Sequence, residues 1–200
     1  NDNGNLTVEE TTISGNTSNR AGGGIEDNTP MTASLGGSSL TLINVDFTNN
    51  STGAAPGNGG GLHVTGAGTI DATGGTVSGN TATAEGGGFW NGSGTMTVDG
   101  TTFDSNTASG NDADQGGGGV FNAGGTVDIS GSTTISGNNA DGSAGSGGGI
   151  LNDAGGNLTV NGATISGNTA VRAGGGIEDN SGTGTTFSLT NVTLDANATA

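Results

Sequence analysis

The 200-residue chain contains 46 glycines, 18 acidic residues and only two basic ones, Arg20 and Arg172, so its formal net charge is −16 at pH 7. Such an acidic chain is not expected to bind nucleic acid or anionic membranes, because both are recognised by basic clusters. The absence of cysteine excludes disulfides and thiolate metal sites. No apolar run approaches the roughly twenty residues that a membrane-spanning helix needs.

Two short apolar patterns recur along the chain at intervals of about thirty residues. The first pattern has two apolar residues two positions apart, which places both side chains on one face of a strand; its members are Leu6/Val8, Leu40/Leu42, Ile70/Ala72, Met96/Val98, Val127/Ile129, Leu158/Val160 and Phe187/Leu189. The second has one apolar residue three positions before an asparagine; its members are Ile13/Asn16, Phe47/Asn50, Val77/Asn80, Phe103/Asn106, Ile135/Asn138, Ile165/Asn168 and Leu194/Asn197. The step between the two patterns is one residue longer from Ile129 to Ile135, which indicates a bulge or a one-residue turn insertion.

A third pattern is a glycine run that ends in one apolar residue. The octet AGGGIEDN occurs at 21–28 and again at 173–180, and looser copies complete a set that ends at Ile25, Leu62, Phe89, Val120, Ile150 and Ile177. Glycine keeps a coil narrow and permits left-handed turns.

These patterns predict an all-β fold, a single-stranded right-handed parallel β-helix of six to seven coils with three short strands each. No segment has a helical period, and a coil this thin buries its apolar residues only by stacking on the next coil. The right-handed crossover rule gives the hand. The asparagines should lie at one corner, where each amide bonds to backbone and to the asparagine of the next coil; they are Asn16, Asn50, Asn80, Asn106, Asn138, Asn168 and Asn197.

A longer repeat relates the two ends of the chain. Residues 4–28 and 156–180 match at 20 of 25 positions with an offset of 152 residues. We therefore expect residues 1–200 to be one continuous solenoid and a fragment of a longer repeat array, which favours a stalk or fibre over a compact enzyme. Insertions between corner asparagine and glycine run predict loops within 50–62, 106–120 and 138–150, and another insertion falls between Ile25 and Leu40.

The glycine run and the apolar-x-x-Asn motif resemble known repeats. GGGI at 22–25, 147–150 and 174–177, with FTNN at 47–50, FDSN at 103–106 and ISGN at 135–138, is similar to repeats of chlamydial polymorphic outer-membrane proteins and of other bacterial-surface β-helix proteins. The resemblance covers essentially the whole chain. It implies an exported, surface-displayed or secreted region that is often adhesive. The second motif departs from the chlamydial pattern because its phenylalanine is mostly Ile, Val or Leu here.

The residue after each apolar residue of the glycine run should point outward. Those positions hold Glu26, His63, Trp90, Phe121, Leu151 and Glu178. One hypothesis makes His63, Trp90, Phe121 and Leu151 an exposed stripe that binds a sugar or a protein. The alternative is that a loop folds over the row and buries it as a satellite cluster.

Other side chains suggest weaker alternatives. Asp112 and Asp114, with Gln115, form the nearest approach to a calcium site, since calcium prefers oxygen ligands. An inverting glycosidase needs two carboxyl groups about 6.5–9.5 Å apart; Asp99 with Asp128 is one candidate pair, and Asp27 with Asp179 is equivalent in sequence but distant. Frequent threonine raises the hypothesis of an ice-binding face, which the irregular coil lengths disfavour.

The sequence therefore predicts an extracellular structural or adhesive repeat region, without enzymatic activity, on the surface of a bacterium or archaeon. The alternative is a β-helix enzyme acting on polysaccharide, of the inverting glycosidase type. The expected partners are further copies of the chain in a fibre, or a surface protein or glycan ligand. No cofactor is expected apart from Ca²⁺.

Overall fold

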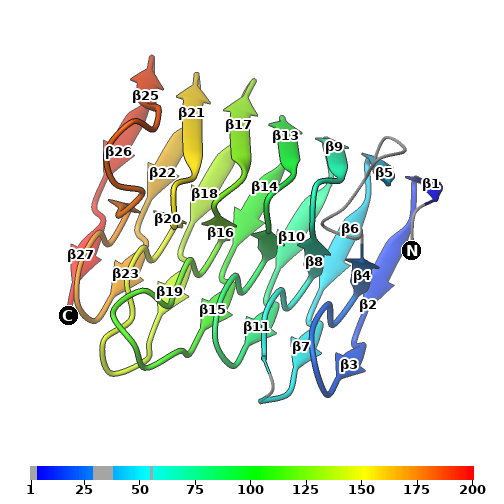
Figure 1. Ribbon diagram of the computed structural model, residues 1–200, viewed down its shortest axis with the longest axis horizontal. Helices are drawn as coiled ribbons and strands as arrows, with labels where there is room; N and C mark the ends of the chain where they lie inside the picture. The colour runs from blue at the N-terminus through cyan, green and yellow to red at the C-terminus, as the bar shows by residue number, and fades with distance from the viewer. Residues whose placement is uncertain (1–3, 29–37, 55) are drawn as a thin grey trace.

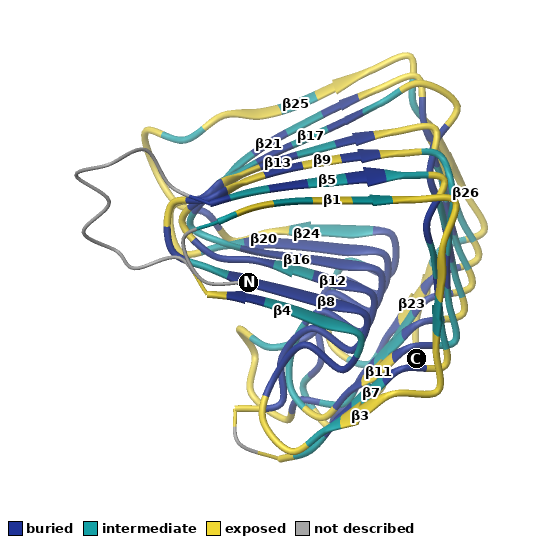
Figure 2. Ribbon diagram, turned by 90° about the vertical axis from the view of Figure 1, so that its right-hand side faces the viewer, coloured by how far each residue is buried: buried dark blue, intermediate teal, exposed yellow. Residues whose placement is uncertain are grey.

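The computed structural model describes residues 4–28, 38–54 and 56–200, which contain 27 strands and no helix. Four parallel sheets run the length of the molecule, because each strand pairs with its counterpart in the next coil (Figure 1). Seen from the N-terminal end, the chain turns clockwise as it recedes, so the coil is right-handed (Figure 2). The parallel β-solenoid that the repeats predicted is confirmed. Within the described residues no helix is long and apolar enough to cross a membrane.

Each sheet collects one kind of strand. The first sheet contains β1 (Asn5–Glu9), β5 (Ser39–Ile43), β9 (Thr69–Thr73), β13 (Thr95–Asp99), β17 (Thr126–Ser130), β21 (Asn157–Asn161) and β25 (Phe187–Thr190). The second contains β2 (Thr12–Ser14), β6 (Asp46–Thr48), β10 (Thr76–Ser78), β14 (Thr102–Asp104), β18 (Thr134–Ser136), β22 (Thr164–Ser166) and β26 (Thr193–Asp195). The third contains β3 (Thr17–Ser18), β7 (Ser51–Thr52), β11 (Thr81–Ala82), β15 (Thr107–Ala108), β19 (Asn139–Ala140), β23 (Thr169–Ala170) and β27 (Ala198–Thr199). The fourth contains β4 (Ile25–Asn28), β8 (Leu62–Thr65), β12 (Phe89–Asn91), β16 (Val120–Ala123), β20 (Ile150–Asp153) and β24 (Ile177–Asp179).

A complete coil therefore has four strands, and the prediction of three was wrong. The missed strands form the third sheet, and each is only two residues long. Such a strand is too short to show an alternating pattern, and its inward residue is small, as with the buried Ala82 and Ala108. Parallel pairing with the neighbouring coils, rather than apolar bulk, makes these segments strands.

The sheets stay in register although the coils differ in length. The extra residue between Ile129 and Ile135 is accommodated by a turn at Gly131 and Ser132, so it is a turn insertion and not a bulge. The longer insertions lie in the segments that join the third sheet to the fourth. The insertion between Ile25 and Leu40 falls mainly on residues 29–37, which lie outside the described residues.

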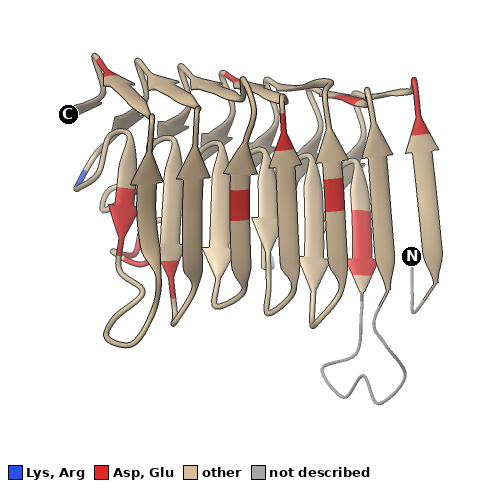
Figure 3. Ribbon diagram, turned by 90° about the horizontal axis from the view of Figure 1, so that it is seen from above, with Lys and Arg blue, Asp and Glu red and all other residues tan. Residues whose placement is uncertain are grey.

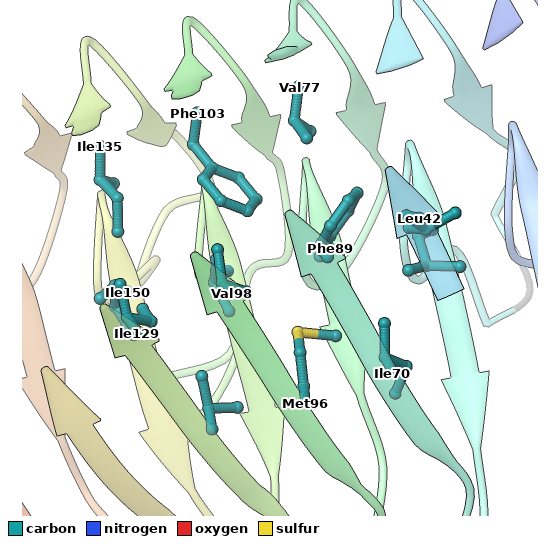
Figure 4. Packing of buried hydrophobic residues seen from close by; sticks show 14 of the residues in the cluster. Leu42, Ile70, Val77, Phe89, Met96, Val98, Phe103, Ile129, Ile135 and Ile150 are labelled. Atoms are coloured by element: carbon teal, nitrogen blue, oxygen red, sulfur yellow. The ribbon is translucent and has the colours of Figure 1, made fainter. Parts of the chain in front are cut away.

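The core fills the space between the first, second and fourth sheets (Figures 2 and 4). Each sheet contributes a ladder of apolar side chains, and the ladders from neighbouring coils are continuous. Phe89 lies at the centre, where its ring meets Phe47 at 5.3 Å and Phe103 at 5.1 Å between centroids, both edge to face. Burial of this apolar ladder is the main source of stability, because no single coil shields its own side chains from water.

The glycine runs are explained by two separate constraints. Gly86 has a φ of +65°, a left-handed conformation that side chains disfavour. The next residue, Gly87, passes so close to β15 that an added Cβ would lie 2.5 Å from the Thr107 carbonyl oxygen. The first glycine therefore turns the chain, and the second lets the fourth sheet approach the backbone of the third.

Candidate functional site

The predicted corner asparagines form a hydrogen-bonded ladder along the whole solenoid. The Oδ1 atom of Asn80 accepts the backbone N–H and the Nδ2 of Asn50, both at 2.9 Å. The Nδ2 of Asn80 donates to the carbonyl of Phe47 at 2.8 Å and to the Oδ1 of Asn106 at 2.9 Å. The same arrangement continues at both ends, to Asn16 and to Asn197. Interior members of this corner ladder thus have every side-chain donor and both acceptor positions occupied.

A second amide ladder lies inside the fourth sheet, and sequence reasoning missed it. Asn91 donates to Asn122 at 3.0 Å, Asn122 donates to Asn152 at 2.7 Å, and Asn152 donates to Asp179 at 2.8 Å. The three asparagines are fully buried. Each lies two residues after the apolar residue of its glycine run, a spacing that would have revealed the ladder. Val64 occupies the equivalent position beside Asn91, and the Asn91 Oδ1 has no hydrogen-bond partner among the described residues.

The outward-pointing residues of the fourth sheet, here called the outward row, also lie in register, but they do not form an exposed stripe. His63, Trp90, Phe121 and Leu151 pair in sequence across β8, β12, β16 and β20. His63 and Phe121 are 2% exposed and Leu151 is 0% exposed, whereas Trp90 is partly buried. The hypothesis of an exposed binding stripe is therefore corrected. The row has the geometry of the alternative, a covered satellite cluster.

The cover comes from the chain that leads into each strand. In Figure 2 the segments between the third and fourth sheets curl beneath the fourth sheet. Their first glycine lies directly under the outward residue of the same coil. An added Cβ on Gly59 would be 2.7 Å from the Cβ of His63, and one on Gly86 would be 2.9 Å from the Cβ of Trp90. The fourth sheet is thus buried on both faces.

The rings of the row are stacked along the solenoid axis. Trp90 lies 4.5 Å from His63 and 6.2 Å from Phe121 between centroids, and its plane is within 2° of that of Phe121. Ion pairs flank the row, Arg20 with Glu26 at 2.8 Å and Arg172 with Glu178 at 3.3 Å. The stack therefore occupies both faces of Trp90, leaving neither face open as a platform for a sugar.

Two titratable groups flank Trp90. The carboxylate of Glu85 accepts the Trp90 indole N–H at 2.9 Å and the Asn58 amide at 3.2 Å. Burial raises the pKa of Glu85. Burial lowers the pKa of His63 to about 4, although nearby Glu26 acts in the opposite direction. The His63 Nδ1 has no hydrogen-bond partner among the described residues, and Glu26 Oε1 is 3.9 Å away.

Arg172 fixes one of the covering loops. Its Nε donates to the Ser146 hydroxyl at 2.9 Å, and its guanidinium also donates to the carbonyl of Ala113 at 3.0 Å. The Ser146 hydroxyl donates to the same carbonyl. The loop containing Asp112 and Asp114 is thereby held against its neighbour, with both carboxylates exposed to solvent.

The acidic residues do not gather into one cluster. Figure 3 shows them scattered over strands and turns. Within the described part of the chain no group of three or more His, Asp or Glu side chains is placed to hold a metal ion. A calcium site at Asp112 and Asp114 stays a prediction.

The candidate carboxylate pairs differ in placement. Asp99 and Asp128 come from the neighbouring strands β13 and β17, where Asp99 pairs with Ser130 and Asp128 with Thr97. Both lie on the outer face of the first sheet. Asp27 and Asp179 lie in β4 and β24, the two edge strands of the fourth sheet, so they do not form a pair. Buried Asp27 instead accepts the Ser38 hydroxyl at 2.9 Å.

Four stacked parallel sheets, a continuous apolar core and two amide ladders define the class of this chain as a parallel β-solenoid repeat protein. No family model, curated protein or solved structure matches it. The finer resemblance to polymorphic outer-membrane repeats has no support beyond the motifs themselves.

Proposed function

We propose that this chain is a rigid repeat region of an extracellular or cell-surface protein, bacterial or archaeal, that serves as a spacer or fibre. The continuous corner ladder carries the proposal. It joins seven successive asparagines through side-chain hydrogen bonds that are buried in the interior coils and part-buried at the two ends, and the apolar core runs parallel to it. Bending the solenoid would break bonds in several coils together, so the element is suited to hold other parts of a molecule apart.

The surface position rests on the motifs and on charge. The glycine run and the apolar-x-x-Asn strand resemble repeats of exported proteins, as described above. A net charge of −16 keeps such a glycine-rich solenoid soluble through mutual repulsion. The long loops at 107–116 and 139–146 are where an adhesive ligand, protein or glycan, would bind.

The partner stays a prediction: further copies of the chain in a fibre, or a surface protein or glycan.

Small-angle scattering and electron microscopy of the purified chain test the rod. A stiff elongated particle is expected. If the chain forms a fibre, these rods should associate as the concentration rises. A flexible or collapsed particle would overturn the spacer, and rods that never associate would overturn the fibre alone. Protease accessibility on intact producing cells tests the surface position.

The polysaccharide-hydrolase alternative stays a prediction. Its test is hydrolysis of a panel of polysaccharides by the wild type, compared with Asp99→Asn and Asp128→Asn. Activity that both substitutions abolish would replace the structural role with an enzymatic one.

A further inference from the structure

The outer face of the second sheet carries two columns of small hydroxylated side chains. The first position of each strand forms the threonine column: Thr12, Thr76, Thr102, Thr134, Thr164 and Thr193, with Asp46 as the exception. The third position forms a parallel column: Ser14, Thr48, Ser78, Ser136 and Ser166, with Asp104 and Asp195 as exceptions. The inward residue between them belongs to the core, as Phe103 and Ile135 do.

The structure removes the objection that irregular coil lengths disrupt such rows. Thr102, Thr134, Thr164 and Thr193 are direct partners in consecutive strands of the second sheet. Among the described residues the length variation lies in the segments that join the sheets and not within the strands of the second sheet. At the exceptional position the Asp46 carboxylate accepts the backbone N–H of Thr76 at 2.9 Å, so that acid is tied to the next coil.

This face is open. In the threonine column Thr12, Thr164 and Thr193 are exposed, and Thr76, Thr102 and Thr134 are partly buried. In Figure 2 the second sheet is an outer wall with no described segment outside it. It carries neither arginine, since Arg20 and Arg172 both lie in the segments that lead to the fourth sheet. The face therefore differs from the outward side of the fourth sheet, which is covered.

The backbone sets the spacing of the hydroxyls. Alternate residues of a strand are about 6.6–6.8 Å apart, and neighbouring strands are about 4.7–4.9 Å apart. Threonine is stiff at χ1 because it is β-branched, so each hydroxyl and methyl is held in place. The Thr134 hydroxyl donates to that of Thr102 at 3.2 Å, which aligns neighbouring groups along the column. The result is a regular two-dimensional array of hydroxyl groups, to which the threonines add methyl groups and which Asp46, Asp104 and Asp195 interrupt.

We propose that this face binds the surface of ice. A crystal of water presents a regular two-dimensional oxygen lattice with repeats of similar size, so many threonines can engage it together. Each hydroxyl both donates and accepts a hydrogen bond. Removal of each methyl group from liquid water contributes favourable free energy to binding. Because the array is fixed before contact, little side-chain entropy is lost on binding.

Strand propensity gives a simpler explanation, since threonine favours strands and cross-strand Thr pairs stabilise sheets. That explanation applies equally to the outward central column of the first sheet, where Asp71 and Asp128 interrupt the threonines Thr41, Thr97 and Thr159. The first sheet therefore serves as the internal control face. The ice proposal goes beyond the structural role and does not depend on it.

The first test measures whether the fluorescently labelled chain partitions into a slowly growing ice crystal. The second measures the gap between the melting and freezing temperatures of an ice crystal in a solution of the chain. The wild type should enter the ice and widen the gap. Thr134→Tyr, which inserts a bulky ring in the threonine column, should abolish both effects. Thr159→Tyr, on the control face, should keep them. Circular dichroism and thermal melting establish that both variants are folded.

Exclusion of the wild type from ice would overturn the proposal. So would equal behaviour of the two tyrosine variants, whether both bind or both fail. A parallel assay with crystalline cellulose and chitin tests the other flat surface that could fit such a face. Binding to these solids without binding to ice would reject ice as the ligand.

Discussion

The indole N–H of Trp90 donates a hydrogen bond of 2.9 Å to the carboxylate of Glu85, in the segment that covers the outward row. Burial raises the pKa of Glu85; the Trp90 bond opposes this rise, and Asp114 and Asp153 add to it. The folded chain thus holds the Glu85 proton to a higher pH than the unfolded chain, whose reference pKa is 4.5. Ionisation of Glu85 therefore costs stability as the pH rises above that value.

Glu85→Gln should remove this cost and keep an oxygen that accepts the Trp90 N–H. We expect the melting temperature of the variant minus that of the wild type to be larger at about pH 7 than at about pH 4. Comparing thermal melts of the two proteins at both values cancels the titration of all other groups. The same difference at the two pH values would show that Glu85 ionises freely in the folded chain.

His63 should have the opposite pH dependence. Burial lowers its pKa from 6.5 to about 4, so between these values the unfolded chain binds more protons than the folded one. Stability is therefore lost as the pH falls through this interval, by at most about 3 kcal/mol. His63→Phe keeps a ring against Trp90 and cannot be protonated, so its stability should fall less between pH 6.5 and 4. Denaturant titrations at several pH values measure the slope, and an unchanged slope would refute the assignment.

The corner ladder should be costly to interrupt. Asn106→Ala removes a side chain that accepts from the Asn80 backbone and amide and donates to the Val77 carbonyl and to Asn138. These groups are buried and would lose their partner, which should cost about 3 kcal/mol or more. Asn111→Ala is the control, because Asn111 lies in an exposed loop and accepts one bond from the Ser143 backbone. Urea denaturation measures the free energy of unfolding of both variants. Similar small losses in the two would show that the ladder is not the source of rigidity.

The second amide ladder, inside the fourth sheet, can be tested by adding a hydrogen-bond donor to it. Val64 lies beside Asn91 in register, and the Asn91 Oδ1 has no partner among the described residues. Val64→Thr has nearly the same shape and supplies a hydroxyl that can donate to this oxygen. Val98→Thr is the matched control, since Val98 is equally buried and faces the apolar core.

An unpaired buried hydroxyl should cost Val98→Thr about 1–3 kcal/mol. Val64→Thr should cost clearly less, because its hydroxyl gains a partner. Equal losses in denaturation experiments would mean that the Asn91 oxygen is already satisfied, for example by water.

Much of the fold was predictable because the repeat is a property of the sequence itself. Side chains two apart must face the same way in a strand, so pairs such as Leu158 and Val160 identify the first sheet without any coordinates. Asparagine three residues after an apolar residue locates the corner, and the intervals between such motifs locate the insertions. The third sheet was not predictable in this way, since two residues such as Thr107 and Ala108 have no period.

The outward row shows what the sequence alone does not determine. Alternation along β12 determines that Phe89 and Trp90 face opposite ways, and the repeat determines that Trp90 lies between His63 and Phe121. Whether those side chains meet water depends on the path of the chain before the strand. The left-handed turn at Gly86 directs that path beneath the sheet, and glycine is compatible with many other paths. Strand direction is a local property, whereas burial on the second face is decided only when the coils pack together.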